Sequence, residues 1–275
     1  MFRKLFVLSL IMVFLFATST PAQAISYGEF DGTAHPFVGS IVIRIPDRGT
    51  FQLCSGTMIS DKVFLTASHC TVPLDGYVVK YPGSVIGVVF EPTITNGSLI
   101  FTGVWHTNPN YNPLVGEHDQ ADPGDVAVIV LDVAPPGITP AQLPAEGLLD
   151  ELKADHILKD TLFTAVGYGT VRDTNRTDGQ GILDNLDRNR ADQEFLSLTD
   201  AWLTNSMNLA TGNGGTCYGD SGGPHFIHID GEETNIVAAI TVTGDAQCKA
   251  TDKDYRMDTE SARSFLAGFE GVILP

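Results

Sequence analysis

The sequence predicts an all-β fold made of short antiparallel strands in two halves. The 275 residues include 28 Gly and 15 Pro, a density that favours turns over long helices. Short apolar runs, some alternating with polar residues, recur between Gly, Pro and Asp turns. With 43% hydrophobic residues, the chain can also bury a sizeable core. Together these observations favour antiparallel barrels or sandwiches.

The predicted elements follow in order along the chain. In the first half, strands are predicted at residues 38–45, 56–60, 63–67, 84–90, 99–105 and 126–131. The Pro- and Gly-rich stretch 134–140 is a natural linker, and a short helix is predicted near 145–154. Strands of the second half are predicted at 161–167, 224–229, 235–243 and 254–257. The polar stretch 171–193 is predicted to be a loop, and 261–269 a C-terminal helix.

The first 24 residues have the order of a secretory signal peptide. Two basic residues, Arg3 and Lys4, precede an apolar run over 5–17, and Ala22-Gln23-Ala24 offers a small-x-small cleavage site. An uncleaved membrane anchor is the alternative, but this run is shorter than the roughly 18 residues that a spanning helix needs. We therefore expect a signal peptide over 1–24 and a mature chain over 25–275.

Charge excludes several classes of partner. The formal net charge is -17, with 33 acidic against 16 basic residues. A nucleic-acid binder would carry a basic surface, and anionic lipid attracts basic segments. We expect neither nucleic acid nor membrane as a partner of the mature chain.

Four cysteines are expected to form disulfides, because an exported chain with an even number of Cys meets an oxidising environment. Three pairings are possible, and the simplest joins the near neighbours Cys54 with Cys70 and Cys217 with Cys248. A zinc site is the alternative, but no C-x-x-C or H-E-x-x-H spacing supports it.

Three segments carry candidate chemistry. His69 ends an apolar strand, and Asp125 opens a strand too apolar to leave a carboxylate unpaired. Taken singly, these residues are more often a structural His and a turn Asp. The segment 217–224 (Cys-Tyr-Gly-Asp-Ser-Gly-Gly-Pro) places Ser221 among three glycines, which permit a sharp turn with N–H groups aimed inward. A nucleophilic Ser needs a base beside it and N–H donors at the developing oxyanion.

The order of these residues along the chain decides between hydrolase types. Gly-x-Ser-x-Gly around Ser221 also fits an α/β-hydrolase, but that fold needs an acid and then a His after the Ser. The only later His are His225 and His228, and Asp230 follows both. The order acid, His, Ser would need an acid before His69, and no such acid opens a long apolar strand (Asp31, Asp47, Asp61). The order His, Asp, Ser fits best.

These segments resemble the chymotrypsin family of serine endopeptidases. The resemblance rests on 66–70 (Thr-Ala-Ser-His-Cys), Asp125 before its apolar strand and 219–224 (Gly-Asp-Ser-Gly-Gly-Pro), with 165–169 (Ala-Val-Gly-Tyr-Gly) in support. It implies two antiparallel six-stranded β-barrels, at about 25–140 and 155–275, with the site in the cleft between them. It also implies the disulfides Cys54–Cys70, beside His69, and Cys217–Cys248, beside the specificity pocket.

The resemblance implies a role for each residue. Ser221 would attack the scissile carbonyl, His69 would move its proton, and Asp125 would orient the imidazole. The N–H groups of Gly219 and Ser221 would form the oxyanion hole. No cofactor or metal is expected.

Activation is expected to depend on Ile25 and Asp220. In the family this chain resembles, a freed N-terminal ammonium pairs with the Asp before the Ser. Residues 25–30 (Ile-Ser-Tyr-Gly-Glu-Phe) look like such a mature start, and Ala24 at the signal cleavage site precedes them. Removal of the signal peptide would itself then release the activating ammonium.

Specificity is expected to depend on Gly215, Thr216, Gly244 and Lys253. Gly215 stands at the expected pocket floor, so a preference for Lys or Arg at P1 is disfavoured, and Gly244 leaves room for a large apolar or aromatic side chain. Lys253, if it points into the pocket, would favour acidic P1 residues. Residues 242–244 (Val-Thr-Gly) replace the Ser-Trp-Gly usual in the family, which leaves open the aromatic wall and the hydroxyl that supports Asp125, for which Thr241 or Thr243 are candidates.

The sequence thus predicts a secreted, monomeric serine endopeptidase that acts on peptides or proteins. The alternative is a protease-like binding or regulatory protein without turnover. His225 and His228 are read as strand residues rather than a metal pair, because i and i+3 on a strand point to opposite faces. The acids before the strand of Asp125 are read as a solvated loop rather than a calcium site (Glu117, Asp119, Asp122).

Overall fold

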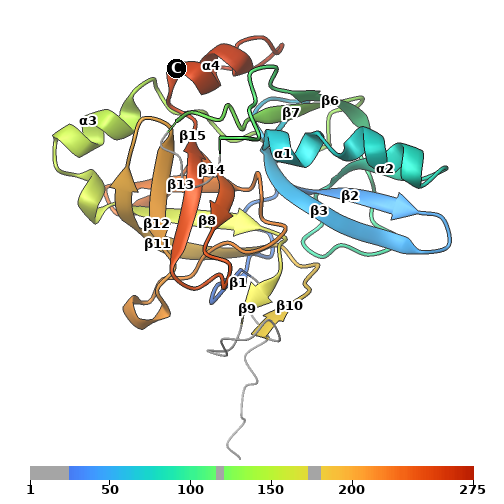
Figure 1. Cartoon of the computed structure of the whole chain (residues 1–275), viewed down its shortest axis with the longest axis horizontal. Helices are drawn as coiled ribbons and strands as arrows, with labels where there is room; N and C mark the ends of the chain where they lie inside the picture. Colours follow the sequence, from blue (N-terminus) through green and yellow to red (C-terminus); the bar gives the residue numbers. More distant parts are fainter. Residues whose placement is uncertain (1–24, 116–120, 173–180) are drawn as a thin grey trace, which may run out of the picture.

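The computed structural model describes residues 25–115, 121–172 and 181–275, and places most of them in antiparallel strands of two neighbouring bodies (Figure 1). The N-terminal body, blue to green in Figure 1, packs beside the larger C-terminal body, yellow to red. The all-β, two-barrel prediction is confirmed. Among the described helices, none has the length and apolar character needed to cross a bilayer.

The N-terminal body is a six-stranded sheet in the order β5-β2-β3-β4-β7-β6. A bridge between Val88 and Phe101 brings the chain just before β6 back to β5, so the sheet curls on itself. Fully buried side chains such as Ile41, Phe64 and Val128 fill its interior. The strands are β2 (Val38–Ile45), β3 (Gly49–Met58), β4 (Val63–Thr66), β5 (Val85–Val89), β6 (Gly103–Thr107) and β7 (Ala127–Leu131).

The C-terminal body is a seven-stranded sheet in the order β1-β11-β12-β15-β14-β13-β8, in which β11 also pairs with β8. That last pairing closes six strands into a ring, and β1 lies outside it. The strands are β1 (Glu29–Phe30), β8 (Leu162–Gly167), β11 (Asn189–Leu198), β12 (Trp202–Ser206), β13 (Pro224–Ile229), β14 (Glu232–Gly244) and β15 (Thr251–Arg256). A small separate ladder pairs β9 (Val171–Arg172) with β10 (Ile182–Leu183).

The predicted loop over 171–193 is wrong in part, because it contains β9, β10 and the start of β11. In β11 the inward residues Asn189 and Gln193 are polar yet buried, so the strand lacks the apolar alternation that marks a half-buried strand. At the chain start, β1 pairs with β11 of the C-terminal body.

Four short α-helices lie within the described part of the chain. The C-terminal helix α4 (Glu260–Leu266) is shorter than predicted and is capped by Thr259, whose Oγ1 accepts the N–H of Ala262 at 3.3 Å. Helix α3 (Leu148–Ala154) lies within the predicted range. Sequence analysis did not predict α1 (Ser68–Thr71) and α2 (Leu74–Lys80), and α1 carries His69. Two 3₁₀ turns, η1 (Leu158–Asp160) and η3 (Leu209–Thr211), complete the described helices.

Candidate active site

Ser221 lies on a tight loop before β13, held by backbone hydrogen bonds from both bodies. The N–H of Ser55 on β3 donates to the Ser221 carbonyl at 2.9 Å, and the N–H of Gly222 donates to the carbonyl of Thr241 on β14 at 2.8 Å. Gly222 has a φ of +79°, and a Cβ there would collide with Thr66 Oγ1 and lie 2.7 Å from the Ser55 carbonyl oxygen. Glycine is therefore required at this position by conformation and by space.

His69 and Asp125 lie together in a two-point contact. The imidazole Nδ1 and Asp125 Oδ2 are 2.8 Å apart, and the His69 backbone N–H donates to Asp125 Oδ1 at 3.0 Å. The Asp125 side chain is 4% exposed and that of His69 30%, so the carboxylate is sheltered while the ring reaches solvent. Such a contact holds the ring with Nδ1 protonated and Nε2 free to accept a proton.

The loop of Ser221 and the helix of His69 lie side by side. Cys70 Sγ is 3.6 Å from the Ser221 carbonyl oxygen, and a disulfide ties Cys70 to Cys54 on β3. Among the described residues, no hydrogen bond joins Ser221 Oγ to His69. Such bonds are often long without substrate and shorten when it binds.

Asp220 is fully buried, and its carboxylate shapes the loop. Its Oδ1 accepts the N–H of Gly169 at 2.7 Å, and its Oδ2 accepts the N–H of Cys217 at 2.9 Å. Burial raises the pKa of Asp220 to about 7, against the opposing effect of these two bonds. The N–H groups of Gly219 and Ser221 have no acceptor within the described part of the chain, so both can donate to a ligand.

Ile25 is fully buried beside the specificity segment. The next residue, Ser26, accepts the N–H of Gly215 at 2.9 Å. In the uncleaved chain Ile25 has a backbone amide rather than an ammonium, and no hydrogen bond joins it to Asp220 among the described residues. The predicted ion pair of Ile25 with Asp220 thus stays a prediction about the cleaved protein.

A cavity of about 320 Å³ opens beside His69. Apart from His69 and Asp125 its walls are largely apolar, and burial together with Asp125 raises the pKa of the Tyr111 hydroxyl in its wall to about 12. The lining residues are His69, Tyr111, Pro113, Val115, Pro123, Asp125, Trp202, Val242 and Thr243. Trp202, on β12, lines the cavity although only 2% of the residue is exposed.

Of the residues predicted at the specificity pocket, Gly215 and Thr216 are buried. A Cβ on Gly215 would lie 2.5 Å from Met207 Cγ and would collide with the Gln193 amide, so side chains already cover this glycine. The hydroxyl of Thr216 donates to Asp252 at 2.6 Å. Lys253 Nζ lies 4.3 Å from the centroid of the Trp202 ring.

Gly244 ends β14 at the rim of this region. A Cβ there would lie 2.7 Å from the carbonyl oxygen of Thr251 on β15, so glycine allows the two strands to approach closely. The following loop is tied by the disulfide Cys217–Cys248, whose two cysteines are 31 residues apart in sequence. Both predicted disulfide pairings are present.

Most of the chain matches a known protein family. The family model described as Trypsin matches residues 26–264. The chain belongs to the trypsin family. A curated trypsin of Saccharopolyspora erythraea is 31% identical over 209 residues, covering 70% of this chain and 77% of that protein. The CLIP domain-containing serine protease B15 of Anopheles gambiae is 24% identical over 222 residues, or 76% of this chain, which spans 60% of the length of that relative.

A solved structure, HL collagenase, shares the trypsin-family fold with this chain. It superposes with a TM-score of 0.57 at 17% identity, covering 90% of this chain and 95% of that one. At this identity the match supports the fold alone. Together with the family model, it makes the protein a homologue of serine proteases with the chymotrypsin fold.

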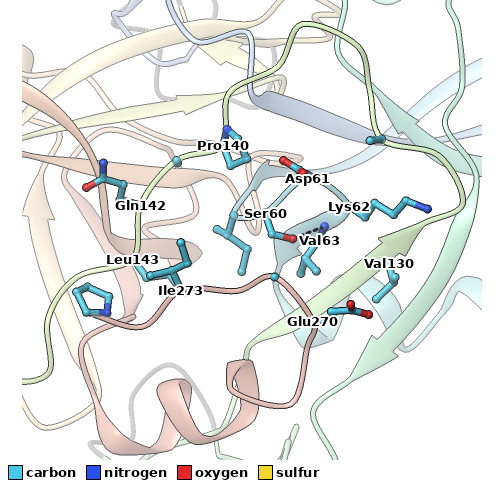
Figure 2. Close-up of a pocket in the computed structure, with 15 residues that line it drawn as sticks. Ser60, Asp61, Lys62, Val63, Val130, Pro140, Gln142, Leu143, Glu270 and Ile273 are labelled. Atoms are coloured by element: carbon cyan, nitrogen blue, oxygen red, sulfur yellow. Dashed lines mark hydrogen bonds between the residues drawn. The ribbon is translucent and has the colours of Figure 1, made fainter.

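A larger pocket of about 1000 Å³ lies elsewhere on this trypsin-family molecule (Figure 2). It is bounded by the β3–β4 turn around Ser60, by the linker at Gln142 and by the C-terminal tail around Ile273. Ser60 Oγ accepts the N–H of Val63 at 3.1 Å, so this serine caps a turn. The pocket shares no lining residue with the cavity at His69 and contains no histidine.

Sequence analysis missed a buried polar group behind Thr216. His225 Nε2 and Asp254 Oδ1 are 2.9 Å apart, Asp252 lies next to them, and burial raises the pKa of Asp254 to about 8. The sequence did contain a sign of this group: in 251–256 (Thr-Asp-Lys-Asp-Tyr-Arg) two acids stand two residues apart, so both face the same side of strand β15. His225 also contacts Thr241 Oγ1 at 2.9 Å, so this hydroxyl is not the predicted support for Asp125.

His228 takes no part in that group. Its Nε2 contacts Thr164 Oγ1 at 2.8 Å, so the reading of the two histidines as strand residues with separate surroundings stands. Of the acids read as a solvated loop, Glu117 and Asp119 lie outside the described residues. Asp122 accepts the Gly124 N–H and the Tyr255 hydroxyl, and so serves as a structural acceptor.

Proposed function

We propose that the protein is an exported serine endopeptidase that hydrolyses peptide bonds through Ser221, His69 and Asp125. The observation that carries the proposal is the two-point contact of His69 with Asp125 beside the loop of Ser221. Ser221 Oγ attacks the carbonyl carbon and its proton passes to His69 Nε2, which then delivers it to the leaving amine. Water next hydrolyses the acyl-enzyme by the same route.

The oxyanion is proposed to form against the N–H groups of Gly219 and Ser221. Both donors lack an acceptor within the described residues, and the buried Asp220 between them fixes the turn. A preorganised donor of this kind typically stabilises the transition state by about 3 kcal/mol.

Activation is proposed to follow directly from removal of residues 1–24. Burial raises the pKa of Asp220, so the carboxyl group favours a positive partner. The new ammonium of Ile25 would supply that partner, since Ser26 already bonds to Gly215 near the loop. The two disulfides and the apolar leader support export to an oxidising compartment.

Substrates are proposed to be peptides or proteins that carry an apolar or aromatic P1 residue rather than Lys or Arg. Support comes from Gly215, which places no charge at the expected pocket floor. The carboxylate of Asp252 behind it is fully buried and bonds to Gln193 and Thr216, so it is not exposed to a basic P1 side chain. A peptide library read at P1 tests this preference.

A fluorophosphonate probe tests the catalytic proposal. The secreted protein is expected to be labelled at Ser221 and to begin at Ile25 by mass spectrometry, whereas the Ser221→Ala variant should stay unlabelled. Ser60→Ala, at the other pocket, is the matched control and should label like wild type. Equal labelling of Ser221→Ala, or none of wild type, would favour the non-catalytic binding protein. The non-catalytic alternative is based on residues 242–244, where Val-Thr-Gly stands in place of the Ser-Trp-Gly usual in the family.

A further inference from the structure

Three potential metal-binding side chains meet inside the C-terminal barrel. They are His225 on β13 with Asp252 and Asp254 on β15, and we refer to them as the His225 cluster. One ligand atom from each lies within 4.8 Å of the others, and all three side chains are fully buried. Such groups do not enter a protein interior without compensation.

The contacts inside the cluster centre on one ring nitrogen. The ion pairs recorded for Asp252 and Asp254 are both with His225 Nε2. That nitrogen also lies 2.9 Å from Thr241 Oγ1. A divalent cation at this point would bind Nε2 in place of the Thr241 contact and would take one carboxylate oxygen from each acid.

Several buried oxygen atoms at the cluster have no hydrogen-bond partner. Asp254 Oδ1 is 2.9 Å from His225 Nε2, yet the pair does not have hydrogen-bond geometry. The amide nitrogens of Gln193 and Asn205 donate to Asp252 and Asp254, while their amide oxygens are unpartnered. The unpartnered Asp254 Oδ1 belongs to the group of ligand atoms that lie within 4.8 Å of one another, and it indicates an occupant such as an ion.

The spacing of the ligand atoms suits a small cation. His225 Nε2 is 2.9 Å from Asp254 Oδ1 and 3.8 Å from Asp252 Oδ2. Two ligands on a tetrahedral zinc ion, each about 2.0–2.1 Å from the metal, lie roughly 3.4 Å apart. Outer partners orient both carboxylates, as is common at metal sites: Thr216 and Gln193 bond to Asp252, and Asn205 bonds to Asp254.

We propose that His225, Asp252 and Asp254 bind a divalent cation with mixed nitrogen and oxygen preference, Zn²⁺ or Mn²⁺, inside the C-terminal barrel. The ion ties β13 to β15. It therefore stabilises β13, which closely follows Ser221 and carries His225, and it fixes the Asp252 carboxylate that accepts the Thr216 hydroxyl. The site is structural and does not depend on the proposed proteolysis.

Metal content and stability test the proposal in the full-length Ser221→Ala protein, which cannot digest itself. Because the cluster is enclosed, the protein is unfolded in denaturant with EDTA, disulfides intact, and refolded with Zn²⁺, Mn²⁺, Ca²⁺ or no metal. After dialysis we expect about one equivalent of Zn²⁺ or Mn²⁺ and no Ca²⁺. The unfolding midpoint should rise by about 5 °C or more over the metal-free protein.

Two cluster variants and one neighbouring control complete the experiment. His225→Gln and the nearly isosteric Asp254→Asn should lose both the bound metal and the metal-dependent rise in midpoint. His228→Gln, three residues along the same strand but outside the cluster, should keep both. If the Ser221→Ala protein held no more metal than its His225→Gln variant and unfolded at the same midpoint with and without metal, protons or water would fill the cluster and the proposal would be overturned.

Discussion

At Asp125 the proposed chemistry depends on which nitrogen of His69 carries the proton. The carboxylate contacts Nδ1 and the His69 backbone N–H together, so it fixes both the ring position and the tautomer. An amide at this position can keep the shape of the side chain but can present its NH₂ to the ring. Nε2 would then carry the proton and could no longer accept one from Ser221.

We therefore expect Asp125→Asn to lower kcat/KM by about a thousand- to ten-thousand-fold while the unfolding temperature changes little. Hydrolysis of a chromogenic peptide ester measures the first quantity, and calorimetry the second. Asp132→Asn is the matched control, because Asp132 follows β7 at its far end and bonds to Thr102 in an exposed position. A similar loss of activity in both variants would argue against the role of Asp125.

At the scale of elements, β8 must approach the loop of Ser221 closely. A Cβ on Gly167 at the end of β8 would collide with Asp220 Oδ1 and lie 3.1 Å from Ser55 Oγ. The carboxylate has little freedom to move, since the N–H groups of Gly169 and Cys217 hold its two oxygens. The absence of a side chain at Gly167 thus allows the loop of Ser221 to lie against β8 of the same body, next to Ser55 of the N-terminal body.

Gly167→Ala is expected to destabilise the protein by about 1–3 kcal/mol, as overpacking usually does, and to slow labelling of Ser221. Gly76→Ala in α2 is the control, because a Cβ there meets nothing within 4 Å. It should be neutral or stabilise by up to ~1 kcal/mol, since Ala is the better helix former. Chemical denaturation measures both changes, and equal stabilities would contradict the close approach.

At the scale of the whole molecule, buried charges tie the chain start to both bodies. Arg188, 1% exposed, bonds to Asp31 Oδ2 at 2.7 Å and to the carbonyls of Val38 and Phe90 at 3.0 Å. His35 bridges Asp31 and Glu233 through its two ring nitrogens. Burial opposes a charge on His35, but the bonds to the two carboxylates outweigh it and raise its pKa, while the pKa values of Asp31 and Glu233 are lowered.

These shifts predict how the contribution of His35 to stability varies with pH. A raised histidine pKa stabilises the fold fully below about 6.5, and the effect disappears as pH rises through the folded value. The lowered carboxylate pKa values stabilise it above about 4, and that effect disappears as pH falls. The test compares the unfolding midpoints of two proteins, the Ser221→Ala variant and the double variant that also carries His35→Gln. The difference between them should thus be largest near pH ~5–6 and shrink toward pH ~9. A difference independent of pH would refute the charged bridge.

Much of the candidate site was predictable because its residues lie in short motifs. His69, Asp125 and Ser221 each stand where local pattern changes, at a strand end, a strand start and a glycine-rich turn. The strands with apolar runs, such as β2 and β7, were predicted for the same local reason. Strand β11 was missed because its inward side chains are polar and find partners only after the barrel closes.

The sequence by itself determined the all-β class, the two halves and the residues proposed for catalysis. These features follow from the spacing of apolar residues and from turn residues, and both signals extend over only a few neighbouring positions. Tertiary structure alone decided which distant side chains meet. Trp202 reaches the cavity of His69, and His225 meets Asp252 and Asp254 from a different strand. Strand register sets such meetings, and a shift of one residue would turn these side chains to the opposite face.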